Sequence, residues 1–246
     1  MFNMQHWKWN LGLRFVYNKI NWEKSIMNKI ERLKQSYIGL SFLVAPLLLI
    51  FGLITHPNLT SLEVMTTGEE FASEYRNNFL LELGHIAVLF SSLFFMGMFS
   101  GINQILKDRR PWIAFIIFVL GFFGSFMLGV DKGAFALVPS AFDTLSESEY
   151  QMLIPGFTAM INYKGAMWIA MLYVFIPISF LISGITLYRN NMVKKWQGIT
   201  IILGALLFFN PDIDLISLFA SVLILIGYFP MAHSFLKSGD IISCNC

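Results

Sequence analysis

The stretch from Glu82 to Leu106 limits the fold most strongly, because it is almost wholly apolar and long enough to cross a lipid bilayer as a helix. Its only ionisable side chains, Glu82 and His85, lie three residues apart near its start. Side chains at this spacing share one face of a helix. Ionisable groups inside a membrane are costly unless they face protein or water. This pair is therefore the first candidate for a functional site.

Other apolar runs accompany this one, and the composition agrees with them. They cover residues 36–54, 112–130, 165–188, 196–209 and 215–232. With 56% hydrophobic and 13% charged residues, the chain of 246 residues has too little polar surface to cover a water-soluble globule. The sequence predicts an all-α fold, a polytopic transmembrane helical bundle of six spans. The last two runs form a helical hairpin, because only the turn-forming segment 210–214 separates them.

Glycines at helical spacing predict which spans pack closely. Gly97 and Gly101 form a GxxxG pattern in one run, and Gly121, Gly124 and Gly129 follow in the next. Small residues let helix backbones approach each other. We expect these two spans to form a tight antiparallel pair.

Residues 1–35 form a separate basic arm. Apolar side chains recur there mostly at three- and four-residue steps among lysines and arginines, as in an amphipathic interfacial helix on an anionic leaflet. A solvated linker is the alternative. No recognition fold accompanies the arm, so no nucleic-acid partner is expected. The arm is followed by the six-span domain, 36–236, and a C-terminal tail, 237–246, which holds both cysteines, Cys244 and Cys246.

The sorting of charges predicts the orientation. With a cytoplasmic N-terminus and six spans, most of the 17 lysines and arginines fall in cytoplasmic segments, and most of the 15 acidic residues fall outside. This is the distribution that membrane insertion favours for lysine and arginine. We expect a multi-pass protein of the cell membrane with both termini cytoplasmic. The loops 55–81 and 143–163 are then extracytoplasmic and acidic.

In this orientation the ionisable groups at the span ends gather on the extracytoplasmic side. Run 196–209 is short for a bilayer, so the residues after it lie below the headgroups. Charged groups at that depth are tolerated where they line a cavity or find partners. The sequence predicts a recessed polar pocket with these ligand-binding residues: Glu82, His85, Asp131, Lys132, Lys164, Asp212 and Asp214.

Three functions are open for such a pocket. It can bind a small molecule, a lipid headgroup or an ion in a transporter-like or accessory protein, with Lys132 and Lys164 facing an anionic group. It can hold a divalent metal such as zinc on His56, Glu82 and His85, in an intramembrane, hydrolase-like enzyme. Its groups can also pair with one another and only lock the helices of a structural subunit that contacts other membrane proteins.

The chain also resembles a group of known proteins. Four features carry this resemblance: the six-span layout, the His56-Pro57 end of the first span, the sequence GHIAVLF in the second span and the sequence DKGAFALVPSAFD after the third. In these features it is similar to uncharacterised bacterial multi-pass membrane proteins of the domain-of-unknown-function type. The resemblance covers residues 36–236 and implies a bacterial or archaeal cell membrane. It implies no particular activity.

Overall fold

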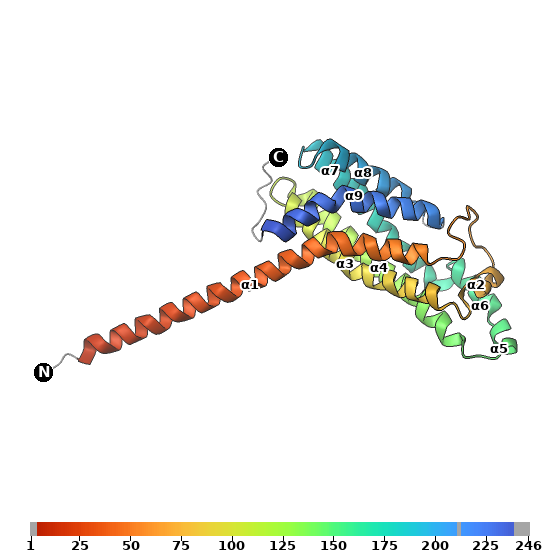
Figure 1. Ribbon diagram of the computed structural model, residues 1–246, viewed down its shortest axis with the longest axis horizontal. Helices are drawn as coiled ribbons and strands as arrows, with labels where there is room; N and C mark the ends of the chain where they lie inside the picture. The colour runs from red at the N-terminus through yellow and green to blue at the C-terminus, as the bar shows by residue number, and fades with distance from the viewer. Residues whose placement is uncertain (1–3, 211–212, 239–246) are drawn as a thin grey trace.

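The computed structural model describes residues 4–210 and 213–238, with side chains from Met27 onward. Every regular element in these ranges is helical, which confirms the all-α class for the part described (Figure 1). The elements are α1 (Met4–Ile54), α2 (Gly68–Tyr75), α3 (Phe79–Leu106), α4 (Pro111–Phe142), α5 (Glu147–Gln151), α6 (Ile154–Ile161), the 3₁₀ helix η1 (Gly165–Val174), α7 (Phe175–Arg189), α8 (Lys195–Leu207) and α9 (Asp214–Ser238).

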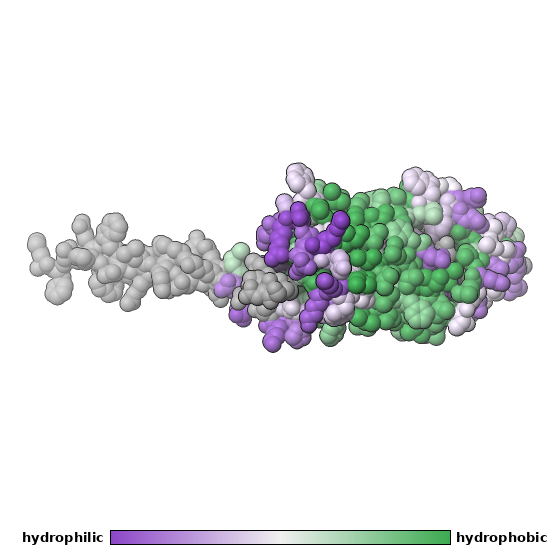
Figure 2. Space-filling model, turned by 90° about the horizontal axis from the view of Figure 1, so that it is seen from above, coloured by the Kyte–Doolittle hydropathy of each residue, from purple (hydrophilic) through white to green (hydrophobic). Residues whose placement is uncertain are grey.

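The surface of the bundle has a wide apolar belt with hydrophilic residues at both ends (Figure 2). Five helical stretches in the described residues are long and apolar enough to cross a membrane. They are Met27–Ile54, Phe79–Leu106, Pro111–Phe142, Ile154–Arg189 and Asp214–Lys237. Such a belt of lipid-facing side chains is the architecture of a helical membrane protein.

The prediction of six spans is wrong, because the fifth predicted span is too short. Helix α8 has 13 residues, which is about 20 Å at 1.5 Å per residue against a hydrocarbon core of about 30 Å. The predicted hairpin is confirmed, since Gly204 of α8 packs on Ile224 of α9 and Gly227 of α9 packs on Ile201 of α8. The chain therefore turns back early, and α9 begins beside the end of α1, where Asp214 meets His56.

Two boundaries also differ from the predicted ones. The arm and the first span are one helix, α1, without a break at residue 35; the side chains up to residue 26 lie outside the described residues, and an interfacial arm stays a prediction. Helix α4 continues through Asp131 and Lys132 to Phe142. Two charged residues do not end a helix by themselves, because they leave its backbone hydrogen bonds intact. The tail, with Cys244 and Cys246, lies outside the described residues.

Small residues set the spacing of the first three spans. The predicted antiparallel pair is confirmed: Gly121 and Gly129 of α4 face α3. The GxxxG glycines, Gly97 and Gly101, face α1 instead, and Gly124 of α4 faces α7. Helix α3 thus packs closely against α1 on one side and α4 on the other.

The two acidic loops fold into a cap over the end of the bundle where α3 begins and α4 ends (Figure 1). Helix α2 starts with a capping box between Thr67 and Glu70, and Arg76 pairs with Glu147 to join α2 to α5. The cap has its own small core, made of Phe71, Ala72, Tyr75, Leu81, Phe135, Tyr150 and Phe157. We call this the acidic end.

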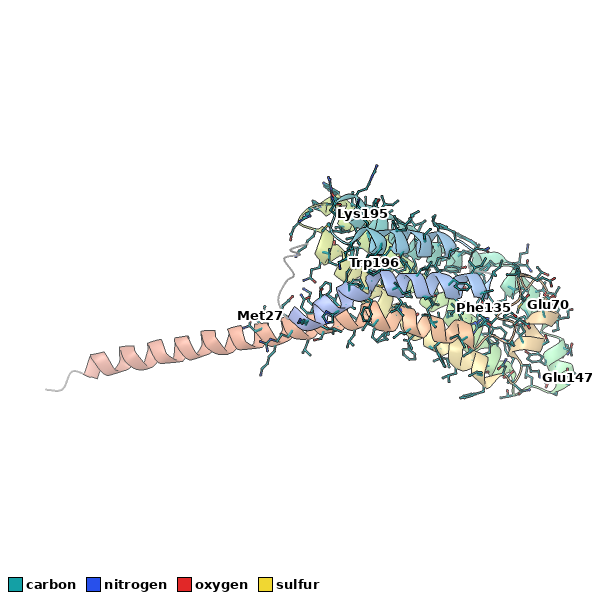
Figure 3. All side chains as sticks on the ribbon, turned by 45° about the horizontal axis from the view of Figure 1, so that its top comes forward. Met27, Glu70, Phe135, Glu147, Lys195 and Trp196 are labelled. Carbon is teal, nitrogen blue, oxygen red and sulfur yellow. The ribbon has the colours of Figure 1, made fainter. Side chains whose placement is uncertain are left out.

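The opposite end of the bundle, which we call the basic end, holds the turns between α3 and α4 and between α7 and α8. Its cations are Lys107, Arg109, Arg110, Arg189, Lys194 and Lys195. Glu70, Phe135 and Glu147 lie at the end away from Lys195 and Trp196 (Figure 3). The fold thus keeps the charge sorting that the sequence predicted.

Candidate functional site

A contact between an imidazole and a carboxylate joins the end of the first span to the start of the last. His56 follows the C-terminus of α1, and its Nδ1 lies 2.9 Å from Oδ2 of Asp214 in the first turn of α9. Both side chains are largely shielded, with 20% and 25% of their surface exposed. A helix N-terminus favours an anion, so the first turn of α9 stabilises the Asp214 carboxylate.

His85 of α3 lies against this pair and has both ring nitrogens occupied. Its ring stacks on that of His56, with centroids 5.0 Å apart. Nδ1 is 3.1 Å from the Leu81 carbonyl, and Nε2 is 2.6 Å from the Tyr75 hydroxyl. A carbonyl only accepts, so Nδ1 carries the proton and Nε2 of a neutral ring accepts from Tyr75. Burial raises the pKa of Tyr75 well above its usual value, which keeps this hydroxyl a donor.

The third polar group of the site is a buried carboxylate with two partners. Asp131 of α4 is 1% exposed, and its Oδ2 lies 3.2 Å from Nζ of Lys132. The Tyr163 hydroxyl donates to Oδ1 at 3.3 Å. Tyr163 has a φ of 50°, a conformation uncommon for a bulky residue, and its aromatic contact with Phe135 helps to hold it. A buried charge requires such partners.

These groups lie between two cavities. Both cavities are lined by His56, His85, Lys132, Tyr163 and Asp214, a set that we call the polar waist. The waist is recessed, because His85 lies six residues, or about 9 Å, below the start of α3.

The inner cavity lies below the waist and is mainly apolar. Its volume is about 140 Å³. Besides the waist and Asp131, its walls come from α1, α3, α4, η1, α7 and the end of α8, and include Leu49, Leu53, Val88, Phe95, Leu128, Tyr173, Ile176 and Phe208. The early end of α8 leaves Phe208, rather than a further helical turn, as part of the wall.

The outer cavity lies above the waist, beneath the cap, and is polar. We call it the vestibule; its volume is about 290 Å³. Glu63, Glu70 and Glu74 line it together with Tyr75. Glu63 and Glu70 are exposed, so the vestibule reaches the surface. The acidic vestibule and the apolar inner cavity thus share the residues of the waist as a common wall.

The structure brings together four of the seven predicted ligand-binding residues: His85, Asp131, Lys132 and Asp214 all line the inner cavity. Glu82 is not among them; it is half-buried and interacts with Asp143 after the end of α4. Lys164 is exposed and lines neither cavity. Asp212 lies outside the described residues.

The predicted metal triad is not assembled. His56 and His85 are in contact, but Glu82 faces Asp143, one helical turn nearer the acidic end. Among the described residues, no group of three histidine, cysteine or acidic side chains is placed to hold a metal ion. The hydrogen bonds of His85 also use the nitrogen that a metal would need.

The sequence prediction missed Tyr75, Tyr163 and the vestibule carboxylates. A signal for Tyr75 was present, because Thr67 and Glu70 have the spacing of a capping box and begin a helix that ends at Tyr75. No comparable signal marks Tyr163, since its position depends on a turn packed against α4.

Comparison with known proteins adds no further assignment: no family model, no curated protein and no solved structure matches this chain. The fold and the site by themselves define a class, a helical membrane protein with a buried polar cluster near one end of its bundle. Its function is therefore argued from the chemistry of that cluster.

Proposed function

We propose that this protein binds a small, partly apolar ligand in the inner cavity and that the ligand enters through the vestibule. The observation that carries the proposal is the apolar cavity directly below the polar waist. Ligand pockets are typically apolar, with a few convergent polar groups that orient the ligand. Here the polar groups lie after the end of α1, on α3, α4 and α9, and at Tyr163 before η1, so ligand binding would bridge four separate spans.

The proposed orientation places the acidic end outside the cell and the basic end in the cytoplasm. The lysines and arginines at the turns of the basic end support it. The resemblance to bacterial multi-pass proteins favours the cell membrane as the location. In this orientation the vestibule opens to the extracytoplasmic side, as in a transporter-like or accessory binding protein.

One observation favours a second function, that of a structural subunit. Asp131, His85 and Asp214 each have a partner within the protein, and such pairs can lock spans together without any ligand. A metal-dependent enzyme has less support, since Glu82 lies away from both imidazoles. The two functions differ in one requirement: a binding protein needs an unfilled inner cavity, whereas a structural subunit does not.

A matched pair of variants on α1 tests this. Leu49 lines the inner cavity, whereas Leu47 is 50% exposed on the lipid-facing surface. We expect the purified wild-type protein and Leu47→Trp to carry the same co-purifying small molecule, detected by native mass spectrometry. Leu49→Trp should lose it while keeping its helix content. No bound molecule in any of the three, across several lipid and growth conditions, would favour the structural subunit.

The orientation has its own test, which the tail cysteines make simple. With Cys244 and Cys246 changed to serine, Ser61→Cys in the vestibule should react with a membrane-impermeant maleimide on intact cells. Lys195→Cys at the basic end should react only after the cells are opened. The reverse pattern would place the vestibule in the cytoplasm and contradict the proposed orientation.

A further inference from the structure

We propose that the ligand of this cavity is an organic cation: an ammonium group at the polar waist beside Asp214, joined to an apolar group about the size of a benzene ring in the inner cavity. This ligand class rests on the proposed binding function. It departs from the anionic ligand that Lys132 and Lys164 suggested in the sequence, and the reasons are the charge, the size and the surface chemistry of the site.

The charge around the two cavities is negative. Lys132 is the only lysine or arginine that lines either cavity in the described part of the chain, and Asp131 neutralises it at 3.2 Å. Among the described residues, Asp214 has the His56 imidazole as its ion-pairing partner, and an imidazole balances a carboxylate only when it is protonated. An arriving anion would therefore meet at the waist the Asp214 carboxylate and a lysine that is already paired with Asp131.

The vestibule adds further negative charge on the way in. Its carboxylates, Glu63, Glu70 and Glu74, have no lysine or arginine among the residues that line the vestibule with them, except Lys132 at its base. Backbone N–H groups of Thr66 and Thr67 lower the pKa of Glu70, so this group is ionised at neutral pH. A cleft lined with one sign of charge concentrates ligands of the opposite sign.

The inner cavity sets the size of the apolar group. A buried cavity of about 150 Å³ lined by aliphatic and aromatic side chains is known to take up benzene. The inner cavity, at about 140 Å³ and lined by side chains of the same kind, matches a single aromatic ring. Phe95, Tyr173 and Phe208 in its wall suit an apolar ring, and Tyr163 places an aromatic side chain at the waist, where the ammonium group would lie.

The test uses three probes of similar size that differ in charge: benzyltrimethylammonium, benzyl alcohol and benzenesulfonate. Binding to the full-length protein in detergent is measured by calorimetry, with Leu49→Trp as the control for uptake by the micelle. We expect the cation to bind about tenfold more tightly than the alcohol and the sulfonate not to bind. The Leu49→Trp variant should bind none of them.

Two substitutions at the waist should change the affinity in opposite directions. Asp214→Asn removes the counter-ion and should weaken binding of the cation about tenfold, with the alcohol unaffected. Lys132→Gln removes the positive charge that competes with the ligand and leaves Asp131 with only hydrogen-bond partners. The benzyltrimethylammonium probe should then bind more tightly to this variant than to the wild type, and it should raise the melting temperature of the variant more. If Lys132 has only a structural role, Lys132→Gln gives no gain in affinity. This variant therefore still tests the cation proposal if Asp214→Asn does not fold.

The outcomes separate the ligand class from the binding function. If the alcohol binds as well as the cation, or the sulfonate binds in its place, the cavity is a binding site and the cation proposal is overturned. If none of the three probes binds better to the wild type than to Leu49→Trp, both the cation proposal and binding of a benzene-sized ligand are overturned.

Discussion

The hydrogen bond from Tyr75 to His85 ties the cap to the membrane-spanning bundle, and removing it should have a measurable cost. The Tyr75→Phe variant keeps the ring but deletes the hydroxyl, which leaves Nε2 of His85 without a donor. His85 is 2% exposed, so water cannot easily replace the donor. Leaving a buried acceptor unsatisfied costs about 1–3 kcal/mol. At 2 kcal/mol we expect the melting temperature to fall by roughly 4–8 °C, the scale for a domain of about 150–250 residues.

Tyr37→Phe is the matched control, because Tyr37 also donates to a single acceptor, the Leu93 carbonyl, and this carbonyl keeps its α-helical hydrogen bond within α3 when the hydroxyl is removed. We expect its cost to stay below about 1 kcal/mol. A double variant, Tyr75→Phe with His85→Leu, should be more stable than the two single effects add up to, by about 1 kcal/mol. The assay is thermal unfolding in detergent followed by circular dichroism. Equal shifts for Tyr75→Phe and Tyr37→Phe, with additive behaviour in the double variant, would refute the proposed bond.

Three further predictions follow from the packing, the cap and the site. Gly84→Ala should destabilise the protein by about 1–3 kcal/mol, because the added Cβ would lie 1.8 Å from Oγ1 of Thr55, where α3 packs on the end of α1. Gly133→Ala is the control: its Cβ would have its nearest neighbour at 3.7 Å, so this variant should be neutral or slightly stabilising in the same thermal unfolding assay. The pKa of Glu70 is lowered, so its stabilisation of the α2 N-terminus is complete at neutral pH and is lost as the pH falls through that lowered value. The loss should be seen as reduced amide-exchange protection over residues 68–75 in acid, and Glu70→Gln should remove this pH dependence. An unchanged pH profile in the variant would contradict the prediction. Because both nitrogens of His85 are hydrogen-bonded, a chelator should leave the melting temperature unchanged, and a drop that added zinc restores would instead support a metal site.

Much of the fold follows from short-range patterns in the sequence. Long apolar runs determine spanning helices, because a backbone in lipid has to satisfy its own hydrogen bonds. The charge sorting and the Asn-Pro-Asp turn likewise predicted the acidic and basic ends and the α8–α9 hairpin. The number of spans was not predicted correctly, since an apolar run records burial in any apolar surroundings, and α8 is too short to cross a bilayer alone.

The candidate site was predicted in part for a similar reason. The sequence placed His85, Asp131, Lys132 and Asp214 near one end of the bundle, and the structure brings them to one cavity. It gave no means of seeing that Glu82 faces Asp143. Residues three apart share a helix face, but the neighbour that each one contacts depends on where the adjacent helices end and how they pack.

The sequence by itself determined that the chain forms apolar helices with acidic and basic ends, because hydrophobicity and charge act locally and need no knowledge of the fold. Only the tertiary structure decided which polar groups share a cavity. The early turn after α8 brings Asp214 to His56, and the folded cap delivers Tyr75 to His85. Both contacts join residues from separate elements, and their geometry depends on the packing of every helix between them.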